Sequence, residues 1–490
     1  MNLPEVALSV PTPAATESAT NRSRWPALAW FKLGTVIEWL AWLLIATVLL
    51  ISAQLHAQNS DEGVLLAGAL RIFRGDRLYL DFFEYVAPGA FYLISGVWRL
   101  IGDADYVSAR IASCLSMALA LAFLWATART VADHRPSSVP LLLFALFVNF
   151  GPVINHNALF VLPASMALYF SASYLTWNRV SAIFLAGMAA SASVLFLQHK
   201  GLALLLPLSL GLAFQAWRTN PSEFMRHVMA LVAGVWIPLG ILFLNWSPEG
   251  LFEVLIRFPA EHYLAVQSSN YFLFVGFLAL TVLVFWISRQ MLAPEVWVGL
   301  LTVQLVLLFT SLQGVDLYHL SVVSMPLVIV LSTLMGDGVP WYGKLLGIGR
   351  VCFALSLAGS LFFVGAFRFW NLTVETLTYQ TASENLMREI RKVCGSEAIL
   401  FAGPFLPGIY FETKIPNISR YSVLLEGLNT FDQFNEVAAA LSRERFACGV
   451  TSMESAAKFG HRGNNPVDEL LSREFKVVQE LYGFKIYSRR

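Results

Sequence analysis

The sequence predicts a polytopic α-helical membrane protein, and three observations lead to that prediction. Of the 490 residues, 57% are hydrophobic and only 13% are charged, whereas soluble domains carry about 25% charged residues. The mean hydropathy is +0.62. Apolar runs close to the roughly 20 residues that cross the hydrocarbon core recur along the chain. The formal net charge of +1 argues against a nucleic acid partner, because such a partner favours a strongly basic surface.

The amino-terminal segment, residues 1–28, is rich in Pro, Ala, Ser and Thr. It lacks a basic stretch that leads directly into an apolar one. We therefore interpret it as a disordered cytoplasmic tail and not as a cleaved signal peptide. The membrane domain is predicted to follow, over residues 29–370.

Eleven apolar runs are predicted to span the bilayer, and they are 33–54, 107–130, 139–153, 158–176, 180–197, 201–217, 228–245, 271–288, 296–312, 319–335 and 346–368. A twelfth run, 88–101, is short, contains Arg99 and is interrupted by Gly96. With a cytoplasmic N-terminus and eleven spans, most basic residues of the short loops, such as Arg179, fall on the cytoplasmic side, as the positive-inside rule requires. Counting 88–101 as a span would reverse that distribution. We therefore predict that it lies along the outer surface, within a long first outer loop at 55–106.

The last part of the chain, residues 371–490, is more polar and alternates helical patterns with short strand-like runs. This pattern predicts a small α/β domain, which eleven spans would place outside the cytoplasm. Cys394 and Cys448 both fall in it. A disulfide between them would suit an oxidising compartment, but the sequence leaves the pairing open.

The predicted outer loops put carboxylates, imidazoles and cations on one side of the membrane. The residues concerned are Asp61, Glu62, Arg74, Tyr79, Asp81, His156, Gln198, His199, Lys200, Arg257, Asp316 and His319. A charge at the bilayer centre costs roughly 2.5–3.5 kcal/mol on insertion scales, so Lys200 is expected at the membrane edge or lining a polar cavity. Such a cluster predicts a site that handles an anionic, lipid-linked substrate.

Each of these features also has a purely structural interpretation. Asp61 and Glu62 follow Ser60 and open a helical pattern, where they would cap the helix and complement its dipole. Arg74 would contact lipid head groups, and the Asn-His-Asn sequence around His156 would be only a turn. The occurrence of all these features together favours a functional site over the separate structural explanations.

An acidic pair directly after the first span, followed by a helix and then by G-x-x-L-Y-x-D-F…P-G-x-F-Y, resembles the GT-C fold of integral-membrane glycosyltransferases. The matching residues here are Gly75, Leu78, Tyr79, Asp81, Phe82, Pro88, Gly89, Phe91 and Tyr92. The resemblance implies many spans, a long first outer loop with surface helices, and an extracytoplasmic C-terminal domain. Similar bacterial enzymes, which include aminoarabinose, galacturonic-acid and protein-mannosyl transferases, use polyprenyl-phosphate sugars as donors.

The resemblance also implies roles for individual residues. Asp61 matches the first-loop acid that acts as general base or orients the acceptor, and Glu62 is its partner. The residues implied at the donor phosphate or substrate are Gln198, His199, Lys200, Tyr79, Asp81 and His319. In the aminoarabinose transferases an arginine-containing stretch follows the acidic pair, whereas Gly63 and Val64 follow it here, so Arg74 and Arg257 are further candidates for the phosphate contact. Several branches hold a divalent metal through an acid in the second outer loop. Here that loop has no carboxylate, so metal dependence stays open, with Asp61 and His156 as candidate ligands, and no other cofactor is implied.

The resulting prediction is an inverting glycosyltransferase of a bacterial inner membrane. It would move a sugar from a polyprenyl phosphate to a glycolipid, glycan or protein on the extracytoplasmic side. Two alternatives stay open, a lipid or polysaccharide transporter or flippase and an inactive scaffold of envelope assembly. The sequence shows no convincing internal repeat of the kind transporters carry, and its polar residues favour span ends over span centres. It does not identify the sugar, the acceptor or the oligomeric state.

Overall fold

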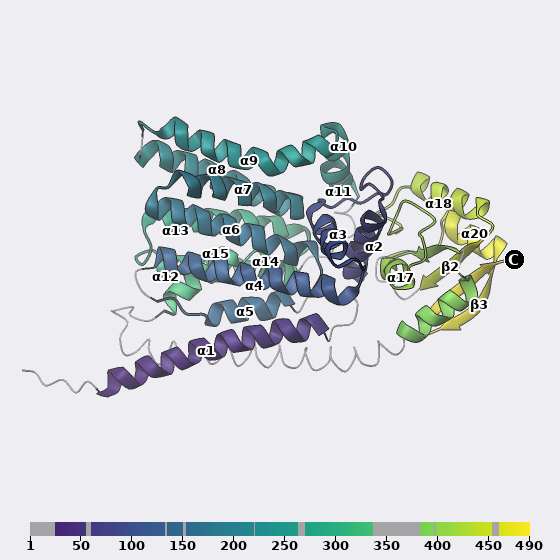
Figure 1. Cartoon of the computed structure of the whole chain (residues 1–490), viewed down its shortest axis with the longest axis horizontal. Helices are drawn as coiled ribbons and strands as arrows, with labels where there is room; N and C mark the ends of the chain where they lie inside the picture. The colour runs from purple at the N-terminus through teal and green to yellow at the C-terminus, as the bar shows by residue number, and fades with distance from the viewer. Residues whose placement is uncertain are drawn as a thin grey trace, which may run out of the picture.

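The computed structural model describes residues 25–54, 60–132, 135–149, 153–219, 221–262, 270–336, 383–395, 398–452 and 460–490. A bundle of long helices occupies one end of the molecule and a β-sheet with its own helices occupies the other (Figure 1). Two short helices, α2 (Ser60–Arg74) and α3 (Gly89–Ile101), lie between these parts.

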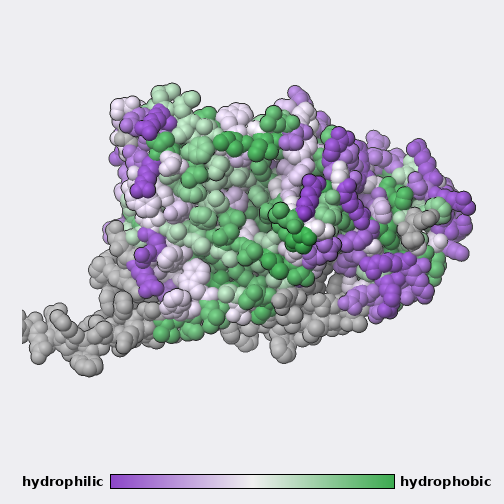
Figure 2. Space-filling view, viewed as in Figure 1, coloured by the Kyte–Doolittle hydropathy of each residue, from purple (hydrophilic) through white to green (hydrophobic). Residues whose placement is uncertain are grey.

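The bundle is built from apolar helices. In chain order they are α1 (Trp25–Gln54), α4 (Tyr106–Val131), α5 (Val139–Asn149), α6 (His156–Trp177), α7 (Val180–Phe196), α8 (Gln198–Thr219), α9 (Phe224–Asn245), α12 (Tyr271–Ser288), α13 (Pro294–Thr310), α14 (Leu317–Val322) and α15 (Met325–Leu334). Of these, α4, α6, α8, α9 and α12 are long and apolar enough to cross a bilayer. Hydrophobic residues cover much of the bundle surface in Figure 2, and hydrophilic residues gather over the C-terminal part. The chain is therefore a multi-pass membrane protein.

Two of the predicted spans do not correspond to a single described helix. The predicted span 319–335 is divided between α14 and α15, which are separated by Val323 and Ser324. The predicted span 346–368 lies outside the described residues. Helix α3 has 13 residues, which gives it a length of about 20 Å, whereas the hydrocarbon core is about 30 Å thick. It is therefore too short to cross the bilayer upright.

Two glycines allow α7 and α9 to approach closely. A β-carbon at Gly187 would lie 2.7 Å from the carbonyl oxygen of Leu231, and one at Gly234 would collide with the carbonyl oxygen of Phe184. Small residues at helix contacts are the usual means of close packing in membranes, where helices gain little from the hydrophobic effect. The outer face of α9 presents Trp236 and Ile241, which are exposed and suited to lipid contact.

After α9 the chain forms three short helical segments. These are α10 (Pro248–Phe252), a π-helical turn η1 (Glu253–Arg257) and α11 (Phe258–Glu261). A 3-10 turn, η3 (Ser311–Gln313), follows α13.

The C-terminal part contains a four-stranded sheet. Its strands are β1 (Ile399–Gly403), β2 (Ala447–Ser452), β3 (Phe475–Leu481) and β4 (Phe484–Arg489), in the order β1-β2-β4-β3. β1 and β2 pair in parallel through a crossover that contains α17 (Pro407–Thr413) and α18 (Phe431–Arg443), and α20 (Pro466–Glu474) precedes β3. β3 and β4 form a hairpin whose turn residues, Tyr482 and Gly483, both have positive φ, as tight hairpin turns require.

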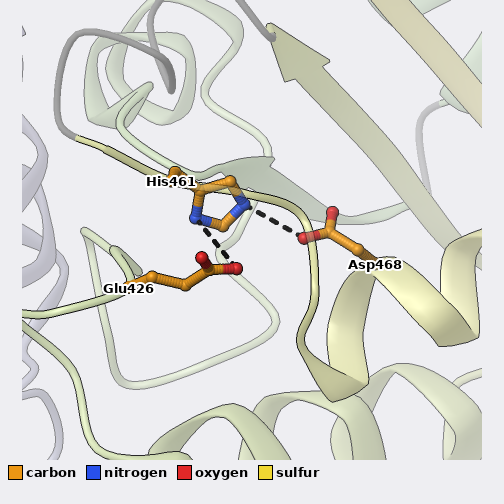
Figure 3. Close-up of side chains that lie close together, drawn as sticks. All are labelled: Glu426, His461 and Asp468. Carbon is orange, nitrogen blue, oxygen red and sulfur yellow. Dashed lines mark hydrogen bonds and ion pairs between the residues drawn. The ribbon is translucent and has the colours of Figure 1, made fainter.

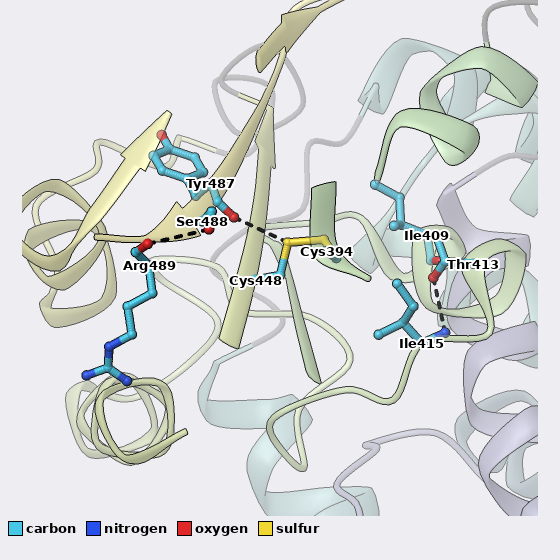
Figure 4. The surroundings of a disulfide bond; sticks show 8 residues. All are labelled: Cys394, Ile409, Thr413, Ile415, Cys448, Tyr487, Ser488 and Arg489. Carbon is cyan, nitrogen blue, oxygen red and sulfur yellow. Dashed lines mark hydrogen bonds between the residues drawn. A yellow bond between two sulfur atoms is a disulfide. The ribbon is translucent and has the colours of Figure 1, made fainter. Parts of the chain in front are cut away.

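A disulfide joins Cys394, at the end of the helical residues 383–394, to Cys448 in β2 (Figure 4). The two Cα atoms are 5.6 Å apart. The structure thus contains the pairing that the sequence left open.

The C-terminal part docks directly on the first-loop helices. Trp98 of α3 stacks on Phe411 of α17, with ring centroids 5.4 Å apart. The Arg71 guanidinium donates to the carbonyl oxygen of Ser419 at 3.0 Å. Gly63 touches α17 so closely that a β-carbon there would lie 2.5 Å from the backbone nitrogen of Gly408. α2 is therefore held on one side by α17.

The contact at Gly63 gives a first testable prediction. A Gly63→Ala substitution should force α2 and α17 apart and cost about 1–3 kcal/mol of stability, the usual cost of overpacking. Gly96→Ala is the matched control, because a β-carbon at Gly96 of α3 meets nothing within 4 Å. Thermal unfolding in detergent should show a lower midpoint for the Gly63 variant and no decrease for the control. Equal midpoints for both variants would contradict the tight contact.

Candidate functional site

The two adjacent acids at the start of α2 have opposite surroundings. Asp61 is exposed, whereas Glu62 is 1% exposed. Successive residues of an α-helix point about 100° apart, so one acid faces the open side of the helix and the other faces the protein interior. The acidic pair therefore combines an accessible carboxylate with a buried one.

Glu62 is fully engaged with its neighbours. Its Oε2 accepts from the Tyr106 hydroxyl at 2.5 Å and from the Arg110 guanidinium at 3.0 Å. Its Oε1 accepts from the backbone nitrogens of Val153 and Ile154, at 2.8 and 3.1 Å. Arg110 is itself 1% exposed and lies over the Tyr106 ring. The Glu62 carboxylate thus holds α2, α4 and the segment before α6 together.

Lys200 lies in the first turn of α8 and is also buried. Its Nζ donates to Asn157 Oδ1 at 2.5 Å, and it lies within electrostatic range of Asp316. Asn157 is fixed in turn by Asn155, whose side chain caps α6 and accepts from both the backbone and the side-chain nitrogen of Asn157. Gly201 lets α8 begin close to α7, because a β-carbon there would collide with the backbone of Val194. The ammonium group is therefore held by oxygen atoms at the end of the bundle.

The segment before α14 completes the cluster. Asp316 caps this helix, and its Oδ1 accepts from the His319 backbone at 2.7 Å while its Oδ2 lies 2.9 Å from His319 Nδ1. Burial opposes ionisation of Asp316, but the hydrogen bonds from His319 outweigh it and lower the pKa of this carboxyl below its usual value. Tyr318 lies within electrostatic range of both Asp61 and Asp316, and His199 within range of Lys200 and His319. The structure thus links His199, Lys200, Asp316 and His319 electrostatically, and Asp61 is connected to this group through Tyr318.

Gln198 connects this cluster to the surface segments. Its Nε2 donates to the carbonyl oxygens of Tyr85 and Leu255, at 3.0 and 3.2 Å. Its Oε1 accepts from the backbone of Ala87 at 3.2 Å. The residue therefore ties the start of α8 to the first loop and to η1.

Several other predicted site residues have structural partners elsewhere. Arg74 lies about 20 Å from Asp61 along α2 and donates to the carbonyl oxygen of Lys414. Arg257 is 57% exposed and pairs with Glu253 and Glu261 of its own helical segment. The structure therefore does not bring Arg74 to the cluster, and it shows Arg257 with its charge already balanced.

The remaining candidates of the first two outer loops, Tyr79, Asp81 and His156, also contact residues outside the cluster. The Tyr79 hydroxyl donates to the carbonyl oxygen of Val86 at 2.6 Å, and Asp81 pairs with Arg77 at 3.1 Å. His156 is buried beside Phe91, with ring centroids 5.0 Å apart. Among the described residues neither ring nitrogen of His156 has a hydrogen-bond partner.

Metal binding by Asp61 or His156 gains no support from the described part of the chain. There, the group of three side chains with metal-ligand atoms close together consists of Glu426, His461 and Asp468. It includes neither candidate.

Sequence reasoning missed Tyr106 and Arg110 as parts of the site, whereas Asn157 and Tyr318 belong to the polar outer loops that it singled out. A signal for one of them was present, because Arg110 lies inside an apolar run, where an arginine is expected to have a buried partner. Nothing in the sequence pointed to that partner, since Glu62 and Arg110 are 48 residues apart.

A cleft of about 360 Å³ opens beside the same network. It is lined by residues at the start of α4, in the helical residues 383–394 and around α17, which include Asp105, Tyr106, Glu384, Arg391, Phe411 and Lys414. Its volume falls in the range of small-ligand sites, about 300–1,000 Å³.

Comparison with known proteins bears on this arrangement. The family model of the dolichyl-phosphate-mannose-protein mannosyltransferases matches residues 85–243. No curated protein matches the chain at a significant level. Part of the chain is therefore similar in sequence to a family of membrane glycosyltransferases.

Solved structures match over almost the whole chain. ArnT from Cupriavidus metallidurans in its apo state is 14% identical, with a TM-score of 0.62, and the match covers 94% of this chain and 98% of that one. The same protein bound to undecaprenyl phosphate gives 13% identity and a TM-score of 0.58 over the same shares of both chains. An oligosaccharyltransferase from Archaeoglobus fulgidus gives 14% identity and a TM-score of 0.47, over 94% of this chain and 75% of that one.

The match to ArnT extends from the membrane helices into the C-terminal part, since it leaves only a small share of either chain uncovered. It confirms the fold that the first-loop motif implied. The protein has the GT-C fold of integral-membrane glycosyltransferases.

Proposed function

We propose that the protein is a glycosyltransferase that moves a sugar from a polyprenyl phosphate to an acceptor hydroxyl at the extracytoplasmic membrane surface. The observation that carries this proposal is an exposed carboxylate, Asp61, and a buried ammonium, Lys200, each at the start of a helix. They are linked through the segment before α14, because Asp316 acts electrostatically on Lys200 and on Tyr318, and Asp61 acts on Tyr318. The Asp61 carboxylate can take up a proton as a base, and the Lys200 ammonium can bind an anionic group.

The donor is proposed to bind with its phosphate near Lys200. An ammonium shielded from water attracts a phosphate more strongly than an exposed one, because the local dielectric is low. His199 and His319 lie within electrostatic range of one another beside it. The structure of ArnT bound to undecaprenyl phosphate supports a lipid phosphate as the donor, because this chain shares that fold.

In the proposed reaction, Asp61 takes the proton of the acceptor hydroxyl as its oxygen attacks the anomeric carbon. The bond from that carbon to the phosphate oxygen breaks, the configuration inverts, and the polyprenyl phosphate leaves toward Lys200. General-base help of this kind contributes about 10²–10⁴-fold. Glu62 acts as a positioning residue, since Tyr106, Arg110 and two backbone amides already use its oxygens.

The acceptor is proposed to be a glycolipid, glycan or protein of the cell envelope. The cleft beside Tyr106 is large enough for a sugar unit and borders the Glu62 network. The Cys394–Cys448 disulfide supports an extracytoplasmic location, because disulfides persist in oxidising compartments. The N-terminus would then be cytoplasmic, as the distribution of basic residues predicts.

Asp61→Asn tests the base directly. We expect turnover to fall by at least about 100-fold, because the amide cannot take the proton, while expression and thermal stability stay at the wild-type level. Asp103→Asn, an exposed acid of the same loop, is the control and should keep its activity. Intact mass spectrometry of envelope glycolipids and glycans from the two strains would measure transfer. Wild-type product levels with Asp61→Asn would exclude this base.

Glu62→Gln separates the two neighbouring acids. It should remove the charge that Glu62 places 3.0 Å from the buried Arg110 guanidinium and cost about 3–5 kcal/mol of stability. We expect a lower thermal midpoint and less folded protein, in contrast to Asp61→Asn. A Glu62→Gln protein that is as stable as wild type but inactive would assign Glu62 a chemical role instead.

Lys200→Met tests the donor site. The loss of the ammonium should lower kcat/KM for the polyprenyl donor by about 100-fold or more, since a charge-assisted contact in a shielded site is lost. Lys392→Met, at a lysine that is 74% exposed, should leave it unchanged. A Lys200→Met enzyme with normal kcat/KM would place the phosphate elsewhere.

A further inference from the structure

A second cluster of charged side chains lies in the C-terminal part, away from the candidate active site. It consists of Glu426, in the loop before α18, His461, and Asp468 in the first turn of α20. Figure 3 shows the His461 ring between the two carboxylates, with one ring nitrogen facing each. Its Nε2 lies 3.0 Å from Asp468 Oδ2, and its Nδ1 lies 3.8 Å from Glu426 Oε1.

The His461 side chain is buried, with 4% of its surface exposed. Its Nε2 is within hydrogen-bond distance of Asp468, but its Nδ1 has no hydrogen-bond partner among the described residues. A distance of 3.8 Å is too long for a hydrogen bond to Glu426. The buried Nδ1 is therefore directed at a carboxylate that it does not reach.

The contact with Asp468 determines what Nδ1 presents to Glu426. When Nε2 carries the proton and donates it to Asp468, the neutral ring has its lone pair on Nδ1. That lone pair then faces the oxygen of a carboxylate. Two electron-rich atoms aimed at each other in a buried place are stabilised by a cation between them.

The spacing suits a metal ion as that cation. Two ligands of one Zn²⁺ lie about 3.3–3.5 Å apart when each bond is about 2.0–2.2 Å long and the angle is tetrahedral. The 3.8 Å between His461 Nδ1 and Glu426 Oε1 would therefore shorten by a few tenths of an ångström on binding. A histidine that binds a metal through one nitrogen usually donates its other N–H to a carboxylate, which fixes the tautomer and the ring orientation. His461 Nε2 lies 3.0 Å from Asp468 Oδ2, the distance at which such an N–H donates to a carboxylate.

Glu426 is held in place as a ligand would be. Its carboxylate accepts from the backbone nitrogens of Arg462 and Asn464, at 2.7 and 3.1 Å, and from the Asn465 side chain at 2.9 Å. Burial opposes its ionisation, but these hydrogen bonds, with that from Asn465 the strongest, lower its pKa below the usual value. The carboxylate is therefore charged at neutral pH and fixed in orientation.

We propose that His461, through Nδ1, and Glu426 bind one divalent transition-metal ion, with water in the remaining positions and Asp468 as the positioning residue for the imidazole. The mixed nitrogen and oxygen donor set suits Zn²⁺ and disfavours Ca²⁺, which takes oxygen ligands. The site is distinct from the glycosyltransferase chemistry proposed above and does not depend on it.

The position of the site gives the metal a structural effect. The loop that contains Glu426 also contains Leu425 and Leu428, which pack with Phe258 of α11 and Phe405 in one hydrophobic cluster. A metal that ties this loop to His461, in the segment before α20, would stiffen the surface on which the C-terminal part meets the membrane-proximal helices.

The test uses the full-length protein in detergent, stripped with a chelator and then titrated with Zn²⁺ alone. Isothermal titration calorimetry and metal analysis after dialysis should find one tightly bound ion per chain, and added Zn²⁺ should raise the thermal midpoint. His461→Gln and Glu426→Gln should abolish this binding. Asp468→Asn should weaken it about 10- to 100-fold, as expected for a carboxylate that orients a ligand. Glu469→Gln, an exposed neighbour in α20, should bind as wild type does.

Two results would overturn the proposal. One is a wild-type protein that binds Zn²⁺ no more tightly than His461→Gln. The other is Glu426→Gln with unchanged affinity. Thermal unfolding of chelator-treated variants and chelator-treated wild type identifies any variant that is misfolded. Because two ligands are substituted independently, the test still stands if one of the two variants does not fold.

Discussion

The buried contact between Glu62 and Arg110 is the interaction on which the candidate site depends. Removing two opposite charges from water costs several kcal/mol per ion, and their attraction offsets this only when the remaining hydrogen-bond positions are filled. Tyr106 and the amides of Val153 and Ile154 fill them for Glu62. One carboxylate thus fixes the start of α2 against α4 and against the segment leading to α6. Asp61, the neighbouring residue, takes its position from that anchoring.

Lys200 is likewise a buried charge that is positioned by a hydrogen bond to another helix. Its ammonium is held by the amide oxygen of Asn157, and Asn157 is held by the residue that caps α6. Helix starts therefore supply both charged groups of the proposed reaction, and each is fixed by residues from another helix. Each group is therefore positioned by contacts between helices, as a functional site on rigid elements requires.

The sequence predicted the membrane class, the first-loop acids and the Gln198–Lys200 motif, because these depend on composition and on local pattern. It also predicted the fold, through the motif that begins at Gly75. It did not predict that Asp61 is exposed and Glu62 buried, since this difference arises from partners that are distant in the chain, such as Arg110. Nor could it explain the glycine after the acidic pair, because Gly63 is required by the backbone of Gly408, more than three hundred residues later. Arg74 was misleading for a geometric reason: it is close to Asp61 in sequence but at the other end of a straight helix.

The contact between α2 and α17 also bears on how the protein is made. Chains are synthesised from the N-terminus, and early segments fold before late ones exist. α2 leaves the ribosome early, yet one of its faces is completed only by α17 and the strands around it. The proposed base would therefore acquire its final surroundings only after the last membrane segment has been inserted and the C-terminal part has folded. A nascent or truncated chain that lacks α17 would therefore lack the complete surroundings of the proposed base.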